Sequence, residues 1–80
     1  MTGTMTVLSP RGDTALAWDT TDQMSVEEVR RAFDQLVKEE RALAYAYAAP
    51  AGDVAAKPEV IREFDPTAHE IVVSPQLVGG

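Results

Sequence analysis

The chain has 80 residues, no cysteine, 13 acidic and seven basic residues, and a formal net charge of −6 at pH 7. This length predicts a single small domain, residues 1–78, followed by a Gly79–Gly80 tail. The composition excludes disulfides and thiol catalysis, and the negative charge disfavours nucleic acid as a partner, because phosphates repel an acidic surface.

The first residues contain no basic segment followed by an apolar run, so we expect no signal peptide. No apolar run approaches the roughly 20 residues that a membrane-spanning helix needs. We therefore expect a soluble, cytoplasmic protein with no membrane partner.

Two alternating segments near the N-terminus predict a β-hairpin. Thr4–Ser9 is rich in β-branched residues, and Thr14–Asp19 alternates with Trp18 on its apolar face. Between them, Pro10 and Gly12 are typical of a tight turn, because proline presets one φ angle and glycine accepts a positive one.

The next segment carries the clearest helix signal. Ser25 is a good N-cap, and Glu28 stands three residues later, as in a capping box. Met24 and Val29 occupy the two positions of a hydrophobic staple. Apolar residues then recur at helical spacing: Val26, Val29, Phe33, Leu36 and Val37. We predict a helix over residues 26–41.

Residues 43–49 allow two interpretations. Leu43, Tyr45 and Tyr47 alternate with alanine, which is a strand pattern, but alanine is also the best helix former and the helix could run on. At helical spacing the two tyrosines would point in nearly opposite directions. We therefore favour a strand, whose alanine face is a flat surface on which another element can lie close.

Residues 50–58 contain two prolines and a glycine and predict an irregular loop. A strand is expected next, over Glu59–Phe64, with Val60 and Phe64 on one face.

The last predicted elements are a single helical turn at Asp65–Ala68, where Asp65 caps and Pro66 takes the first helical position, and a strand at Ile71–Ser74. This strand has apolar residues on both faces, so we expect it at the centre of the sheet. The order predicts an α+β, ββαββ architecture, a mixed sheet with one helix across one face. The first and last strands can pair in parallel at its centre.

This order, together with residues 71–80, resembles the β-grasp fold of ubiquitin and of the small sulfur-carrier proteins of molybdopterin and thiamine synthesis. The last ten residues look like the strand, proline-containing connector and Gly-Gly tail of the molybdopterin-type carriers. Two features depart from that family: Gln76 stands where a second proline is usual, and the Trp18–Asp19 and Phe64–Pro66 segments are not associated with it.

The resemblance implies a function without catalytic groups, metal or cofactor of its own. An ATP-dependent adenylating enzyme would activate the Gly80 carboxylate, and Gly79 would let the tail enter a narrow crevice because glycine has no Cβ. The product would be a thiocarboxylate that donates sulfur, or an isopeptide bond to an amine. The protein would thus be a handle for other proteins, not an enzyme.

Four other residues are candidates for binding a protein partner: Trp18, Tyr45, Tyr47 and Leu77. Aromatic side chains are frequent anchors at interfaces, but in so small a protein they also build the core. His69 is the single histidine and forms neither a triad nor a metal site alone.

A second function suits the same composition. A small acidic α+β domain without a catalytic constellation can be a structural or adaptor subunit of a larger assembly, such as a phage particle or a multiprotein machine. Its Gly-Gly pair would then have no chemical role.

Overall fold

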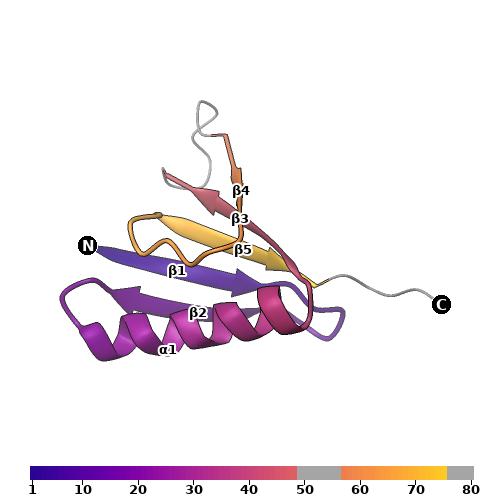
Figure 1. Ribbon diagram of the computed structural model, residues 1–80, viewed down its shortest axis with the longest axis horizontal. Coiled ribbons are helices and arrows are strands. Elements are labelled where there is room, and N and C mark those ends of the chain that lie inside the picture. Colours follow the sequence, from indigo (N-terminus) through magenta and orange to yellow (C-terminus); the bar gives the residue numbers. More distant parts are fainter. Residues whose placement is uncertain (49–56, 76–80) are drawn as a thin grey trace.

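The computed structural model describes residues 1–48 and 57–75, which form a five-stranded mixed sheet with one helix packed across one face (Figure 1). The sheet order is β2-β1-β5-β3-β4. The central strands β1 and β5 pair in parallel, and the other neighbours are antiparallel. The strands are β1 (Thr2–Val7), β2 (Thr14–Asp19), β3 (Leu43–Tyr47), β4 (Glu59–Ile61) and β5 (Glu70–Ser74). The expected α+β class and the parallel central pair are confirmed, whereas the order along the chain is ββαβββ, with one strand more than ββαββ.

The hairpin of β1 and β2 closes through the expected turn. The Gly12 N–H donates to the Ser9 carbonyl at 3.1 Å, and Gly12 has a φ of 123°, a region that side chains disfavour. β1 begins at Thr2 and ends at Val7, two residues earlier than predicted, because Ser9 belongs to the turn.

The helix α1 (Gln23–Asp34) begins earlier than the sequence predicts, so the assignment of Ser25 as its N-cap is wrong. Asp22 caps it instead, and its carboxylate accepts the Met24 N–H at 3.2 Å. Met24 is 75% exposed, so it forms no staple. The Ser25 hydroxyl accepts the Asp19 N–H at 2.9 Å and thereby ties the helix to the end of β2.

The helical segment does not stay α-helical to residue 41. After Asp34 it continues as a π-helical turn, η1 (Gln35–Glu39), in which the Glu40 N–H donates to the Gln35 carbonyl at 3.1 Å. The segment ends at Arg41, which has a φ of 58°.

The core lies between α1 and the sheet. The helix contributes Val29 and Phe33, and β3 presents Ala44 and Ala46 to the same layer. Residues 43–47 are therefore a strand, and its alanine face is buried in the core. The innermost sheet residues are Met5, Ile71 and Val73, all at 0% exposure.

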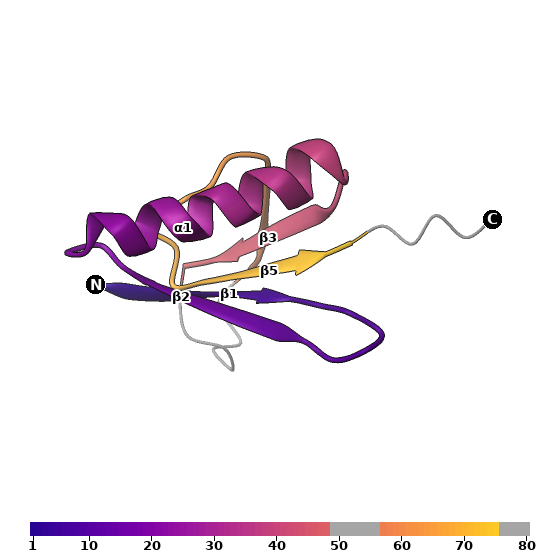
Figure 2. The ribbon, with the colours of Figure 1, turned by 90° about the horizontal axis from the view of Figure 1, so that it is seen from below.

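A cluster of aromatic rings fixes the segment between β4 and β5. Trp18 is 1% exposed, and its indole N–H donates to the Pro66 carbonyl at 3.1 Å. Its ring lies edge-on to Phe64 with centroids 5.0 Å apart, and Phe64 lies 5.8 Å from Phe33. In Figure 2 the segment after β4 accordingly crosses to the helix side of the sheet.

This cluster corrects two predictions. β4 ends at Ile61 and not at residue 64, because the chain leaves the sheet to bring Phe64 to the core. Val60 and Phe64 consequently do not share a face: Phe64 contacts the core, whereas Val60 is 60% exposed.

The segment from Asp65 to Ala68 is a hydrogen-bonded turn and not a helical one. The Ala68 N–H donates to the Asp65 carbonyl at 3.2 Å, and the Asp65 carboxylate accepts the Thr67 N–H at 2.9 Å. Asp65 thus caps this segment as predicted. Among the residues that the structure describes, no helix has the length and apolar character required to cross a membrane.

Candidate functional site

The sheet has one face that α1 does not cover, which we call the open face (Figure 2). Its residues follow from the strand registers and from the alternation of burial, since each core residue is flanked by residues of the opposite face. The open face carries Thr2, Thr4, Thr6, Ala15, Ala17, Asp19, Leu43, Tyr45, Tyr47, Val60, Glu70, Val72 and Ser74.

Four apolar residues gather on one half of this face. Tyr45 on β3 pairs directly with Val60 on β4 and with Val72 on β5, and Leu43 lies two residues before Tyr45. Val60 is 60% and Leu43 41% exposed, whereas Tyr45 and Val72 are half-buried. We call these four residues the apolar patch. Directly paired side chains on one face touch each other, so the patch is a continuous surface.

The charged residues of the open face, Asp19 and Glu70, lie toward the other end of the sheet. The Asp19 carboxylate accepts the Thr21 N–H at 2.9 Å and the Thr21 hydroxyl at 2.7 Å. These hydrogen bonds stabilise the ionised form and lower the pKa of Asp19 below its ordinary value of 3.8, the backbone bond having the larger effect. Within the described residues, the patch itself contains no ionisable group other than the Tyr45 phenol.

The patch lies at the end of the sheet from which the chain leaves β5. Ser74, the last residue of β5, pairs with Leu43, the first residue of β3. The preceding residue, Val73, accepts the Leu8 N–H on its carbonyl at 2.9 Å, so the exit point is held from both sides. Any partner that contacts the patch therefore sits beside the start of the C-terminal segment.

The structure separates the residues that the sequence proposed as a site. Tyr45 and Tyr47 lie on the open face, as a partner-binding role requires. Trp18 does not: it is buried in the core, so its assignment as an exposed partner-binding residue is wrong. Leu77, Gly79 and Gly80 lie outside the described residues.

Sequence reasoning missed the other three members of the patch: Leu43, Val60 and Val72. Two signals were present. Val72 is the apolar residue between Ile71 and Val73, so it must face the side of the sheet opposite to theirs. Leu43 lies two residues before Tyr45, so the two share a face of the strand. Val60 was expected to share a face with Phe64, because β4 was extended to that residue.

The open face carries the groups that a docking surface uses. It offers apolar side chains, a phenol hydroxyl and threonine hydroxyls, and exposed apolar surface of this kind is typical of sites that bind other proteins. Among the described residues, no group of three or more His, Cys, Asp or Glu side chains is arranged to hold a metal ion.

Comparison of the chain with protein-family models, with curated proteins and with solved structures finds no match.

Proposed function

We propose that the chain is a ubiquitin-like or sulfur-carrier-like protein of the β-grasp type, whose Gly80 carboxylate is activated by an ATP-dependent adenylating enzyme. The domain has no catalytic role in this proposal. It is the surface that the enzyme recognises, and the segment after β5 carries the reacting group.

One observation carries the proposal: the strand that leads to Gly79–Gly80 is the central strand β5, and the apolar patch lies beside its end. An enzyme that docks on the patch is thereby placed next to the segment it must act on. The order of the elements, the parallel pairing of β1 with β5 and the single helix across one face also support a β-grasp assignment.

The chemistry needs a free carboxylate and no group from the domain. An oxygen of the Gly80 carboxylate attacks the α-phosphate of ATP, which forms an acyl-adenylate and releases pyrophosphate. A sulfide donor then displaces AMP to leave a thiocarboxylate, or an amine displaces it to form an amide. Glycines at both positions let the backbone approach the enzyme closely, because no Cβ obstructs it.

The test begins with the C-terminal peptide of the protein purified from its own cells through an N-terminal tag. We expect mass spectrometry to find Gly80 as the last residue and a fraction of the peptide with sulfur in place of one carboxylate oxygen, or joined to a lysine. A variant with one alanine added after Gly80 should lose both products. A matched variant with one alanine added before Met1 should retain them. Unmodified Gly80 in every condition would refute the proposal.

A second candidate function is favoured by the same patch. A structural or adaptor subunit of a larger assembly also needs an exposed apolar surface to pack against its neighbours. The two functions differ in the extended variant: an adaptor whose contacts are made through the open face keeps its assembly when alanine follows Gly80. The adaptor loses its assembly when Val60 is replaced by Lys. Modification of Gly80, by contrast, would be reduced in both variants.

A further inference from the structure

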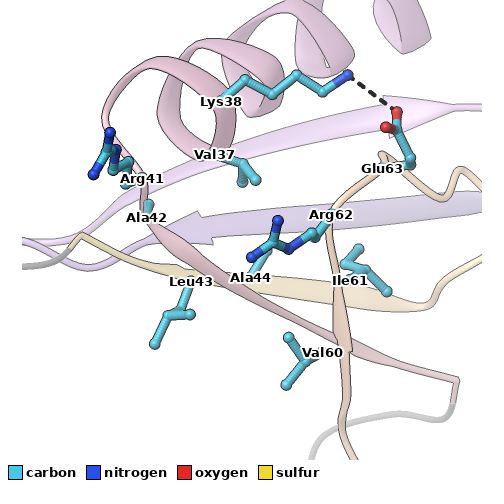
Figure 3. A pocket seen from close by; sticks show the side chains of 10 residues that line it. All are labelled: Val37, Lys38, Arg41, Ala42, Leu43, Ala44, Val60, Ile61, Arg62 and Glu63. Atoms are coloured by element: carbon cyan, nitrogen blue, oxygen red, sulfur yellow. Dashed lines mark hydrogen bonds and ion pairs between the residues drawn. The ribbon is translucent and has the colours of Figure 1, made fainter.

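A groove lies between the end of the helical segment and the β3–β4 edge of the sheet (Figure 3). Its volume is about 670 Å³. The floor is apolar and is formed by Val37 from η1, Ala44 from β3 and Ile61 from β4. Two members of the apolar patch, Leu43 and Val60, also line it but point away from the helix.

The walls of the groove are basic in a protein that is acidic overall. Lys38, Arg41 and Arg62 line it, and the acidic residue among the lining side chains, Glu63, is 3.2 Å from the Lys38 ammonium. Figure 3 shows the Arg62 side chain lying over Ala44, inside the groove. Three of the seven basic residues of the chain are thus gathered at one place. The Lys38 ammonium is also 3.8 Å from the Asp34 carboxylate, so the charge offered to a ligand comes from Arg41 and Arg62.

The backbone beside these cations is irregular. Residues 35–39 form a π-helical turn, and such turns occur frequently at functional sites. Arg41 follows with a φ of 58°, a conformation that usually belongs to glycine at the end of a helix. The Ala42 N–H donates to the Leu36 carbonyl at 2.9 Å and holds this geometry.

The sheet edge at the groove is also incompletely covered. β4 pairs with Ala44–Ala46 only, so Leu43 has Ser74 as its partner in β5 and no partner in β4. At Arg62 the chain turns from the sheet toward the helix, and Glu63 contacts Lys38. Leu43 is the one residue at this end of β3 that β4 leaves unpaired, so the backbone of an extended segment can contact β3 there.

We propose that this groove binds an extended acidic peptide segment of a partner protein. The carboxylates of the segment face Arg41 and Arg62, and its apolar side chains lie on Val37 and Ile61. The net charge of −6 repels any anion at long range, but a short peptide carries fewer charges than a nucleic acid, so the attraction to Arg41 and Arg62 has less repulsion to overcome. The site is separate from the chemistry of Gly80 and does not depend on it.

The probe is a fluorescent heptapeptide in which valine and isoleucine alternate with aspartate and glutamate. The control is the same peptide with lysine in place of every acidic residue. We expect the acidic peptide to bind with a dissociation constant of about 100 µM at low salt, more weakly as salt rises, and the lysine peptide not to bind. Amide shifts in an NMR titration should be confined to residues of η1, the start of β3 and the end of β4.

Three variants make the test specific. Arg62→Gln and Arg41→Gly should each weaken binding about threefold, and the double variant about tenfold. Arg11→Gln, in the hairpin turn, removes the same charge outside the groove and should leave affinity unchanged. Arg41→Gly should also raise the urea midpoint of unfolding, since glycine relieves the backbone, so a loss of binding cannot be ascribed to a damaged fold.

Several results would overturn the proposal. These are no binding up to about 1 mM peptide, equal binding of the lysine peptide, equal effects of Arg11→Gln and Arg62→Gln, or shifts centred on Tyr45 and Val72. Displacement of the peptide by single-stranded RNA at the same charge concentration would also refute it, because the groove would then be a general anion site. None of these outcomes depends on whether Gly80 is modified.

Discussion

Replacing Gly3 by alanine tests how Trp18 is held in the core. Gly3 and Trp18 are direct partners in the β1–β2 pairing, and the indole ring lies against the glycine. A Cβ at position 3 would stand less than 3.0 Å from three atoms of that ring. The ring cannot stay, and any shift disturbs its 3.1 Å hydrogen bond to Pro66 and its packing on Phe64.

The expected cost follows from these contacts. Overpacking a core costs about 1–3 kcal/mol, a lost hydrogen bond about 1 kcal/mol, and a disturbed aromatic pair about 1 kcal/mol. Alanine returns roughly 0.5–1 kcal/mol, because glycine weakens a strand. We therefore expect Gly3→Ala to reduce the free energy of unfolding by about 2–4 kcal/mol, which is a large part of the stability of a domain of this size.

The measurement is urea unfolding followed by the fluorescence of Trp18, which is the sole tryptophan. A double-mutant cycle supplies the control, with circular dichroism as the signal. In a Trp18→Phe background the outer ring is absent, so Gly3→Ala should cost less than about 1 kcal/mol. If the two substitutions instead add within about 0.5 kcal/mol, the clash is not what makes glycine necessary.

Three further outcomes are expected. Asp19 has a lowered pKa when folded, so its contribution to stability is present above its ordinary pKa of 3.8 and is lost as pH falls through the lowered value. Asp19→Asn should therefore flatten the acid side of a plot of the urea midpoint of unfolding against pH, and an unchanged plot would contradict this. Ala46→Leu, at 8% exposure in the core cluster and away from the groove, should cost about 1–3 kcal/mol in thermal unfolding, whereas the same change at exposed Ala17 should cost less than about 1 kcal/mol. Arg41→Gly should stabilise the fold by about 0.5–1 kcal/mol in urea, and a loss of stability would show that the positive φ is not strained.

Much of the fold could be predicted because its signals are local. The alternation in Thr14–Asp19 and Leu43–Tyr47 gave two strands with their buried faces, since a period of two residues depends only on neighbours in sequence. The apolar character of both sides of Ile71–Val73 gave the central position of β5, which the sheet order confirms. These features need no knowledge of distant contacts.

The errors arose where a distant contact decides the outcome. Asp22 and Ser25 are both good capping residues, and the sequence favoured Ser25 because Glu28 follows it. In the structure the Ser25 hydroxyl bonds Asp19 at the end of β2, which leaves the cap to Asp22. Phe64 likewise leaves the strand pattern to reach Trp18, 46 positions earlier in the sequence shown.

The candidate site was predictable only in part for the same reason. The alternation of Tyr45 with alanine allowed either a partner-binding surface or the core, and its neighbours Val60 and Val72 come from strands that only the register brings together. The groove had no sequence signal, because Arg41 and Arg62 are 21 positions apart and line one groove only because β3 and β4 pair.

The two proposed surfaces meet at one strand end, and this connects the proposals physically. Leu43 belongs to the apolar patch, lines the groove and pairs with Ser74 at the exit of β5. A partner whose acidic segment occupies the groove is therefore placed at the edge of the patch, beside the start of the C-terminal segment. The groove contributes charge, which salt screens, whereas the patch contributes apolar burial, which salt does not screen. The salt dependence of binding by any natural partner consequently distinguishes which surface holds it, and a partner that uses both retains its apolar part when Arg41 and Arg62 are replaced.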